Sequence, residues 1–457
     1  MRQVTLPWLQ GLFNKFLKNP LFRRVILNSG YLFSATGISA ALSMFQSMLA
    51  GKLLGVAGFG ILGTITTFTS VINRLLSFRM GELVIKYVGQ YSQTGDNQRA
   101  AAVFKAAALA EMAASILAFG LVCLLAPWGA RVFTESPALT GAFTLYGLII
   151  LANLISESST GLLQIYDRFR PVAVLNVFQS ALTLGIIAAV YLLGGDLTGV
   201  LVAYLSGKVF AAGGLSIMAF QEASRQWGSN WWRTPLGILR PQTRELAHFA
   251  VSTNLSGTLS LINKDSDLLW LQFFRPSSEV GLFKAALAVT NLVQLPVSPL
   301  PQATYPEISR EVASKNWGNV RYILRQGSLI AGGFTIAATI VLTLFGRPVL
   351  QFLYSPEFLP AYPALLILLA GFLLANTFYW NRTALLALGR PDFPTKVNLL
   401  LALMKTAGIL LLVPRFGHLA SAALLAGSYL IGVTVSVFKA NQIMSQQEQM
   451  INRGVEV

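Results

Sequence analysis

The chain has 457 residues, of which 54% are apolar and only 11% are charged, whereas an average soluble domain has roughly 25% charged residues. This composition excludes a water-soluble globular protein, and the apolar runs that recur between residues 25 and 439 predict an all-α, polytopic membrane protein. The formal net charge of +16 would suggest nucleic acid in a soluble protein, but here the bases stand between apolar runs, so we expect them to set topology and expect no nucleic-acid partner.

Twelve apolar runs of about 20 residues or more predict transmembrane helices. Before them, residues 1–24 carry apolar side chains at helical spacing beside Lys15 and Lys18, which predicts a short amphipathic helix lying on the membrane surface. The predicted spans are near residues 26–51, 56–79, 100–126, 140–165, 171–193, 198–220, 245–271, 278–303, 323–345, 359–386, 394–413 and 418–439.

The distribution of lysine and arginine predicts the orientation of these spans. With a cytoplasmic N-terminus, 26 of the 34 bases fall on the cytoplasmic side and 7 on the other, and Lys405 remains inside the eleventh span. The positive-inside rule therefore predicts that both termini are cytoplasmic.

The sequence also contains an internal repeat. Landmarks in the first half recur in the second half at a nearly constant offset and at the same place in the hydropathy pattern: Gly60 as Gly281, Ser92, Asn97 and Arg99 as Ser314, Asn319 and Arg321, Gly129 as Gly346, and Pro171 as Pro394. This offset predicts two parallel six-helix lobes around a central cavity. Their predicted bounds are 25–222 and 245–439, with a tryptophan- and arginine-rich cytoplasmic linker at 223–244 and a cytoplasmic tail at 440–457.

The sequence lacks the motifs of common enzyme active sites. The stretches between spans are too short for a catalytic domain, and the sequence contains no phosphate-binding loop, HExxH motif or nucleophile elbow. One cysteine, Cys123, excludes an intramolecular disulfide, and two distant histidines are too few for a metal site, so we expect no metal, no cofactor and no enzyme. A secondary transporter, a channel or a membrane scaffold remains, and two parallel six-helix lobes favour alternating access.

Ionisable residues inside apolar spans are costly and so indicate where a ligand binds. Bases are as frequent as acids among them, which favours an anionic ligand over a drug cation. As substrate-binding residues we predict Lys264 in the seventh span, Lys284 in the eighth, Arg382 in the tenth and Lys405 in the eleventh. Each has an alternative: interfacial pairing for Lys264, snorkelling for Lys284, membrane anchoring for Arg382, and an internal salt bridge for Lys405.

Four carboxylates are candidates for coupling transport to an ion: Glu111, Glu157, Asp265 and Asp267. Glu111 and Glu157 lie in the third and fourth spans, where they could carry a proton or pair with a base. Four prolines, Pro296, Pro299, Pro301 and Pro306, crowd the inner half of the eighth span, and each removes a backbone donor. They predict a kink that could act as a gate or merely shape the packing.

Several strings resemble the bacterial polysaccharide transport proteins, which are the oligosaccharide-lipid flippases of a superfamily that also contains multidrug exporters and the peptidoglycan-precursor flippase. The resemblance covers nearly the whole chain. It rests on GVAGFGILGTITTF from Gly55, GELVIKYVGQYSQTGD from Gly81, DSDLLWLQFFRPSSEVGLFKAAL from Asp265 and YPEISRE from Tyr305.

The resemblance implies two six-helix lobes in a V and the movement of undecaprenyl-diphosphate-linked sugar repeat units from the inner to the outer leaflet of the bacterial cytoplasmic membrane, for capsule, exopolysaccharide or O-antigen assembly. It also implies contact with membrane lipids and with a polysaccharide polymerase or assembly proteins. The alternatives are a cation-coupled multidrug antiporter, against which the uncharged first span argues, and a non-transporting scaffold of an assembly complex.

Overall fold

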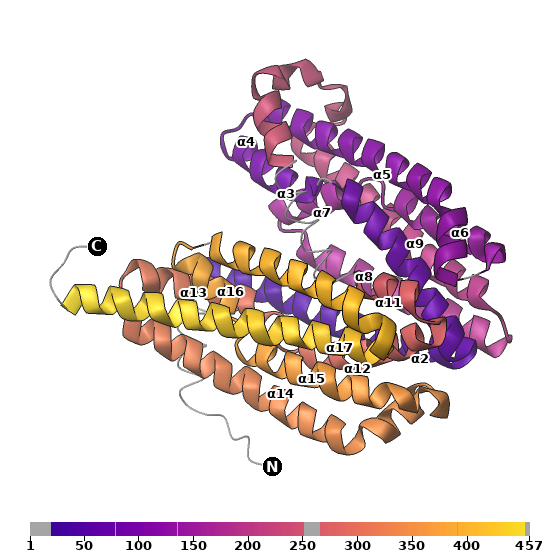
Figure 1. Cartoon of the computed structure of the whole chain (residues 1–457). Coiled ribbons are helices and arrows are strands. Elements are labelled where there is room, and N and C mark those ends of the chain that lie inside the picture. Colours follow the sequence, from indigo (N-terminus) through magenta and orange to yellow (C-terminus); the bar gives the residue numbers. More distant parts are fainter. Residues whose placement is uncertain (1–19, 78, 135, 251–265, 391, 453–457) are drawn as a thin grey trace, which may run out of the picture.

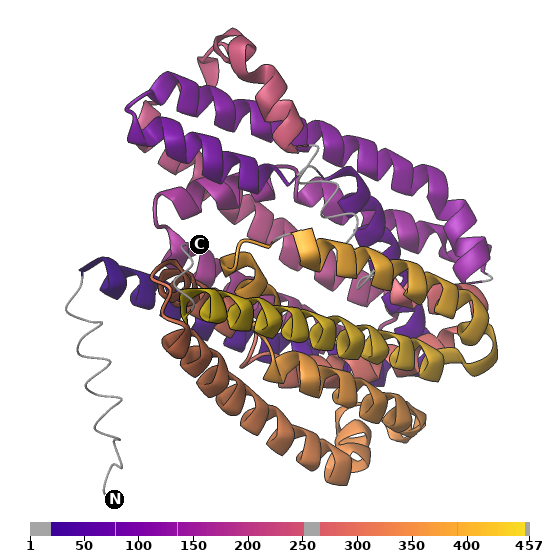
Figure 2. The same ribbon diagram turned by 60° about the vertical axis from the view of Figure 1, so that its left-hand side comes forward.

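The computed structural model describes residues 20–77, 79–134, 136–250, 266–390 and 392–452. These residues form helices, turns and loops, without a strand among them. Figures 1 and 2 show the helices gathered in two lobes, the first from the N-terminal half of the chain and the second from the C-terminal half. The all-α prediction is confirmed.

The first lobe follows the order of the predicted spans. Its helices are α2 (Pro20–Leu76), α3 (Met80–Leu83), the π-helical turn η1 (Val84–Val88), α4 (Gly89–Gln93), α5 (Asn97–Thr134), η2 (Pro137–Leu139), α6 (Thr140–Ala152), α7 (Ser156–Ile165), α8 (Phe169–Leu192) and α9 (Leu197–Trp227). Two short 3-10 helices, η3 (Trp231–Arg233) and η4 (Leu236–Gln242), form the linker.

The second lobe repeats this order. Its helices are α11 (Asp267–Phe274), α12 (Ser277–Gln294), α13 (Leu300–Ala313), α14 (Trp317–Leu353), η5 (Pro356–Ala361), α15 (Tyr362–Thr377), α16 (Asn381–Ala387) and α17 (Asp392–Asn452). Helix α17 continues past the predicted end of the last span, at residue 439, to Asn452.

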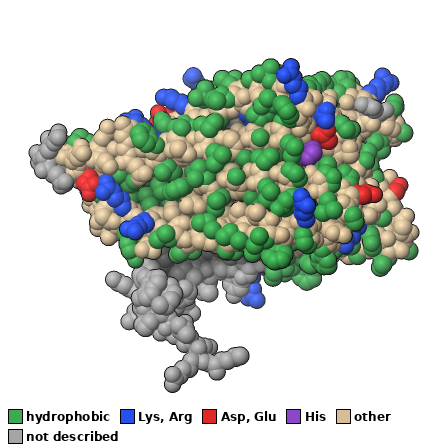
Figure 3. All heavy atoms as spheres, turned by 60° about the horizontal axis from the view of Figure 1, so that its bottom comes forward, with side chains coloured by type: hydrophobic (Ala, Val, Ile, Leu, Met, Phe, Trp, Pro, Cys, Tyr) green, Lys and Arg blue, Asp and Glu red, His purple; other side chains and the backbone are tan. Residues whose placement is uncertain are grey.

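Eight helices of the described chain are long and apolar enough to cross a membrane. Two of them, α2 and α17, are bent sharply at Gly55 and Gly417, whose φ angles of 64° and 56° suit glycine, and each corresponds to two predicted spans. Helix α12 is less apolar than these eight helices because it carries Glu279 and Lys284. Hydrophobic side chains are spread over the whole face in Figure 3, as expected of a surface that meets lipid.

The backbone repeats as the sequence landmarks do. Gly194 makes the turn between α8 and α9, and Gly417 makes the bend of α17; both have positive φ, and the same offset separates them as separates Pro171 from Pro394. Asp167 after α7 and Gly389 after α16 also share the left-handed conformation at equivalent places. The two halves therefore have equivalent turns, as an internal repeat requires.

The lobes share one core at one end of the molecule and have separate cores at the other. The bends of α2 and α17 lie at the end of the molecule away from the marked C-terminus, and we call this the distal end (Figure 1). There, one apolar cluster joins both lobes through Phe59 and Phe358. At the opposite, proximal end the cluster around Phe104 contains residues up to Ala250 and the cluster around Trp380 contains residues from Val297 onward, so the lobes part toward this end.

The amphipathic helix predicted in residues 1–24 lies almost entirely outside the described residues. The first residues of the predicted second lobe contact the first lobe. Phe249, which the predicted bounds place in the second lobe, contacts Tyr87 of the first with ring centroids 5.7 Å apart, and Glu245 accepts a 2.8 Å hydrogen bond from the Tyr87 hydroxyl. The segment that follows the linker is therefore attached to the first lobe at the proximal end.

Candidate functional site

Two interrupted spans meet inside the first lobe. The second span stops at Leu76 and resumes as α3 after Arg79, whose φ is 48°. The fourth span is broken between α6 and α7, at residues 153–155. The breaks face each other because Gly161 of α7 lies so close to α3 that a Cβ there would be 2.7 Å from the Gly81 carbonyl oxygen. Broken spans expose polar backbone inside a membrane and commonly form binding sites.

A polar cavity of about 640 Å³ lies at this junction, and a smaller one of about 250 Å³ adjoins it. Both are lined by hydroxyl, amide and charged side chains from α2, α7, α9 and the breaks. The residues common to the two cavities are Ser77, Asn153, Ser156, Glu157 and Lys208.

Glu111 of α5 fixes the break in the fourth span. Its carboxylate accepts hydrogen bonds from the backbone amides of Glu157 at 2.8 Å and Ser158 at 2.9 Å, and from the Ser158 hydroxyl at 2.6 Å. The first amides of a helix have no partner within the helix and favour negative charge. Glu111 therefore acts as an N-terminal cap for α7, supplied from a neighbouring span.

Lys208 is the cation that the cavity leaves without a partner. It is the twelfth residue of α9, roughly 16 Å along the helix from its distal start. No hydrogen bond or ion pair joins Lys208 to any part of the chain that the structure describes. Arg74 lines the same cavity, whereas Arg79 is paired with Glu82 at 2.9 Å.

This arrangement suits a polar anion. A half-buried ammonium without a counter-ion makes stronger charge-assisted hydrogen bonds to a phosphate or carboxylate than an exposed one. The surrounding serine, threonine, asparagine and glutamine side chains can donate to and accept from the hydroxyl groups of a sugar. Glu157, which accepts a 3.0 Å bond from the Ser77 hydroxyl, keeps the cavity from being uniformly positive.

Of the residues singled out in the sequence, the structure brings Glu157 to both cavities and Glu111 to the smaller one. Lys284 lies elsewhere, between the lobes. Its ammonium is 4.1 Å from the centre of the Phe59 ring and donates a 3.4 Å hydrogen bond to the Phe59 carbonyl oxygen. Arg382 is exposed at the second residue of α16.

Lys405 and Asp267 form a buried ion pair in the second lobe. The ammonium is 2.6 Å from one carboxylate oxygen and 2.9 Å from the other, and the side chains are only 2% and 5% exposed. Of the two environments expected for Lys405, a pore wall and an internal salt bridge, the structure has the salt bridge. Lys264 and Asp265 lie outside the described residues.

The prolines of the eighth span lie where that span is interrupted. Helix α12 ends at Gln294 and α13 begins at Leu300, with Pro296 and Pro299 in the turns between them and Pro301 in the first turn of α13. The predicted kink is confirmed as a complete break, and a gating role for it stays a prediction.

Sequence reasoning misses the three bases of the larger cavity, Arg74, Arg79 and Lys208. The positive-inside pattern groups Arg74 and Lys208 with the cytoplasmic helix ends, yet Lys208 lies in the middle of the predicted span 198–220. The criterion that selects Lys405, a charge at the centre of an apolar run, selects Lys208 as well. Glu111 as a helix cap has no sequence signature, because its partners are 46 and 47 residues away.

The family assignment follows from the sequence match. The model of the family described as "Polysaccharide biosynthesis protein" matches residues 25–312, which is more than half of the chain. The chain belongs to this family, and the resemblance noted from the sequence is confirmed.

Two relatives extend the match. The chain is 25% identical over 348 residues to the inner membrane protein YghQ of Escherichia coli K12, covering 75% of this chain and 95% of YghQ. It is 26% identical over 174 residues to a probable flippase, AglR, of Haloferax volcanii, covering 37% of this chain and 36% of AglR.

Solved structures share the fold. A multidrug resistance MATE family transporter of the MOP superfamily, in an inward-facing conformation, aligns with a TM-score of 0.72 at 14% identity over 90% of this chain and 96% of its own. The lipid II flippase MurJ, in an inward closed conformation, aligns with a TM-score of 0.69 at 16% identity over 92% and 91%. The protein is therefore a multi-pass membrane protein with the two-lobed fold of these transporters, as the sequence predicts.

Proposed function

We propose that this protein is a flippase that moves an undecaprenyl-diphosphate-linked oligosaccharide across the bacterial cytoplasmic membrane by alternating access. Its family supports a role in polysaccharide biosynthesis, and its fold supports membrane transport. The product would feed capsule, exopolysaccharide or O-antigen assembly, where a polymerase is the natural partner.

The observation that carries the proposal is Lys208. An unpaired ammonium inside the membrane region is costly unless a ligand or water compensates it. A diphosphate supplies that compensation, with Arg74 as a second donor, and the sugar then meets the polar side chains around Ser77 and Asn153. The three bases of the larger cavity outnumber its two carboxylates, Glu82 and Glu157, which disfavours a drug cation and therefore the multidrug alternative.

The charges near the helix ends and in the connections support cytoplasmic termini. The distal end carries few bases, namely Lys52, Arg131, Arg275, Arg347 and Arg415. The proximal end carries many more, namely Arg79, Lys86, Arg99, Lys105, Arg168, Arg170, Arg225, Arg233, Arg240, Arg244, Arg310, Lys315, Arg321, Arg325, Arg390, Lys396 and Lys439. The positive-inside rule then assigns the proximal end to the cytoplasm. The lobes, joined at the distal end, would receive the glycolipid from the cytoplasmic side.

The test follows a labelled undecaprenyl-diphosphate glycan between the leaflets of reconstituted vesicles. Lys208→Gln removes one charge-assisted contact to phosphate, worth about 1.5–3 kcal/mol, and is expected to slow movement at limiting substrate about 10- to 100-fold. Lys396→Gln is the matched control, because Lys396 is exposed and paired with Asp392 at 3.3 Å at the start of α17.

Three results would contradict the proposal in different ways. Equal rates in the Lys208→Gln and Lys396→Gln proteins would remove the cavity from the mechanism. Transport of an organic cation, with no movement of any lipid-linked glycan, would establish the antiporter. An intact protein that moves neither, but retains its partners in an assembly complex, would establish the scaffold.

A further inference from the structure

Two glycines that occupy the same position in the two halves of the chain meet at the distal end. Gly60 of α2 and Gly281 of α12 are equivalent in the repeat and are packed on each other's helix. A Cβ on Gly60 would overlap the carbonyl oxygen of Ser277, and one on Gly281 would overlap that of Val56. Neither glycine has a positive φ, so the requirement for glycine is one of space, set by the close approach of the two backbones.

The crossing of α2 and α12 joins the lobes and is surrounded by buried apolar side chains. Beside it, Phe59 of the first lobe packs on Tyr354 and Phe358 of the second, with ring centroids 5.5 and 5.9 Å apart, and both phenylalanines are fully buried. The Thr64 hydroxyl donates a buried 2.9 Å hydrogen bond to Gln272 of α11. These contacts close the space between the lobes at this end.

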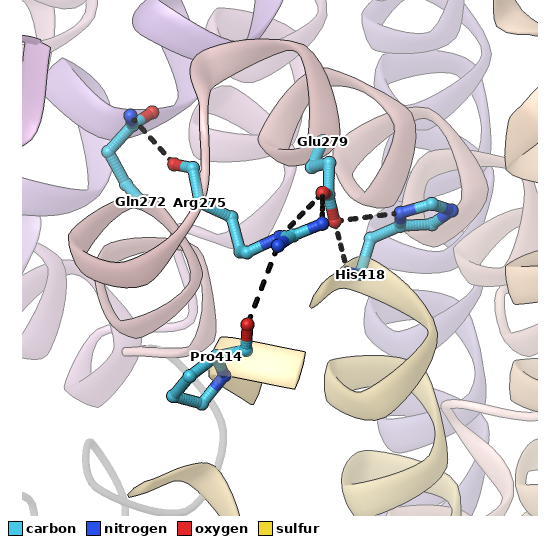
Figure 4. A network of polar contacts seen from close by, with 5 residues as sticks. All are labelled: Gln272, Arg275, Glu279, Pro414 and His418. Carbon is cyan, nitrogen blue, oxygen red and sulfur yellow. Dashed lines mark hydrogen bonds and ion pairs between the residues drawn. The ribbon is translucent and has the colours of Figure 1, made fainter. Parts of the chain in front are cut away.

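The start of α12 is fixed to the second lobe by a polar cluster (Figure 4). Glu279 accepts hydrogen bonds from the backbone amide of His418 at 2.9 Å and from Arg275, while Arg275 also donates to the Pro414 carbonyl at 3.4 Å. A side chain at Gly417 would overlap the Glu279 carboxylate. Helix α12 is thereby tied to the bend of α17 and must move with the second lobe.

Lys284 lies one turn from Gly281, on the proximal side of the crossing. Its stem fills the space over Gly63, where a Cβ would be 2.9 Å from the lysine Cδ. Its ammonium is held by Phe59, the residue before Gly60. Parting of α2 from α12 would therefore remove the present partner of a half-buried cation and open the seal above it.

We propose that the crossing at Gly60 and Gly281 is the distal gate of the transporter, closed in this structure by the contact of two backbones, and that any side chain at either glycine holds it open. The inference rests on the proposed alternating access of the lobes and names the contact that has to break and re-form. It predicts that the gate is limited by side-chain size at both glycines.

The experiment measures access of a water-soluble reagent to the space behind the gate. Asn291 is an exposed residue of α12, seven positions after Lys284 and so on the same helix face. In a Cys123→Ser background, Asn291→Cys serves as the reporter for a membrane-impermeant thiol reagent. The reagent is added to right-side-out and to inverted vesicles separately, so that each end of the protein is probed.

With glycine at both positions, labelling from the distal side should be slow and labelling from the proximal side fast. Gly60→Val and Gly281→Val should each raise the distal rate about tenfold or more, because the closed population falls. Gly37→Val on the same helix, where nothing lies within 4 Å of a Cβ, is the matched control and should leave the rate unchanged.

The gate is disproved if distal labelling is the same in the Gly60→Val, Gly281→Val and Gly37→Val proteins. Gly60→Ala and Gly281→Ala add a single methyl and decide the matter where a valine variant aggregates, with a smaller increase expected. The labelling needs no substrate. If the glycine variants raise distal labelling in a protein that moves no glycolipid, the proposed function is refuted and the gate is retained. If the protein moves glycolipid but the variants leave distal labelling unchanged, only the gate is refuted.

Discussion

The interrupted fourth and tenth spans are equivalent in the repeat, yet they are filled in opposite ways. In the first lobe the break between α6 and α7 is surrounded by Glu111, Glu157 and Lys208 and borders a polar cavity. In the second lobe the break between α15 and α16 is filled by rings: Tyr379 and Trp380 are 7% and 4% exposed.

The cause lies in the spans that pack against each break. The offset of 221 to 222 residues that relates Gly60 to Gly281 and Arg99 to Arg321 places the pair Gly332 and Gly333 of α14 at the position of Glu111 of α5, and a Cβ on Gly332 would be 3.1 Å from Thr377. Nearby, the Trp380 indole donates a 2.7 Å hydrogen bond to the Ser328 hydroxyl. A carboxylate caps the broken helix in one lobe, whereas small residues admit aromatic rings in the other.

At a second pair of equivalent positions, the charged residue is in the second lobe and the neutral residue is in the first. Gln46 of α2 donates a 2.8 Å hydrogen bond to the Ser180 carbonyl oxygen in the first lobe. Asp267, which corresponds to Gln46 at the same offset, makes the buried ion pair with Lys405 in the second. The repeat therefore fixes where helices break and contact, while the side chains give the first lobe an open polar cavity and the second lobe a buried ion pair.

The largest effect is expected at the ion pair. Lys405→Met leaves Asp267 as an uncompensated buried carboxylate, which should lower the free energy of unfolding by about 3–5 kcal/mol. Thermal unfolding in detergent, followed by tryptophan fluorescence, measures the change. The double variant Asp267→Asn with Lys405→Met, which buries no charge, should recover most of the loss; a double variant as unstable as the single one would speak against the pair.

The second largest loss of stability is expected where Glu111 caps α7. Glu111→Ala removes the acceptor of two backbone amides and a hydroxyl, and should cost about 2–3 kcal/mol because water from the adjoining cavity can reach only part of the site. Ser115→Ala, which changes the wall of the smaller cavity without touching the cap, is the control. Equal melting temperatures for the two variants would mean that α7 does not depend on Glu111.

The smallest effect is expected at the first-lobe counterpart of the ion pair. Gln46→Met removes one neutral hydrogen bond while keeping the side-chain length, so about 1 kcal/mol should be lost in the same unfolding assay. A loss as large as that of Lys405→Met would show that the two equivalent sites are energetically alike, contrary to the contrast between the lobes.

Much of this fold is readable from the sequence because lipid demands long apolar helices and the repeat supplies landmarks such as Gly60 and Gly281. The break after α12 is readable from its prolines. The breaks after Leu76 and Ala152 are not, because they contain no proline and depend on contacts between α3, α7 and Glu111. The pairing of Asp267 with Lys405 likewise joins residues 138 positions apart, which no local pattern encodes.

The central claim, that the cavity of the first lobe binds the diphosphate of a lipid carrier, is tested most directly by ligand-induced thermal stabilisation in detergent. Undecaprenyl diphosphate should raise the melting temperature of the unmodified protein, undecaprenol should not, and the increase should be lost or much reduced in Lys208→Gln while Lys396→Gln retains it. An equal increase with undecaprenyl diphosphate in the Lys208→Gln and unmodified proteins would contradict the claim.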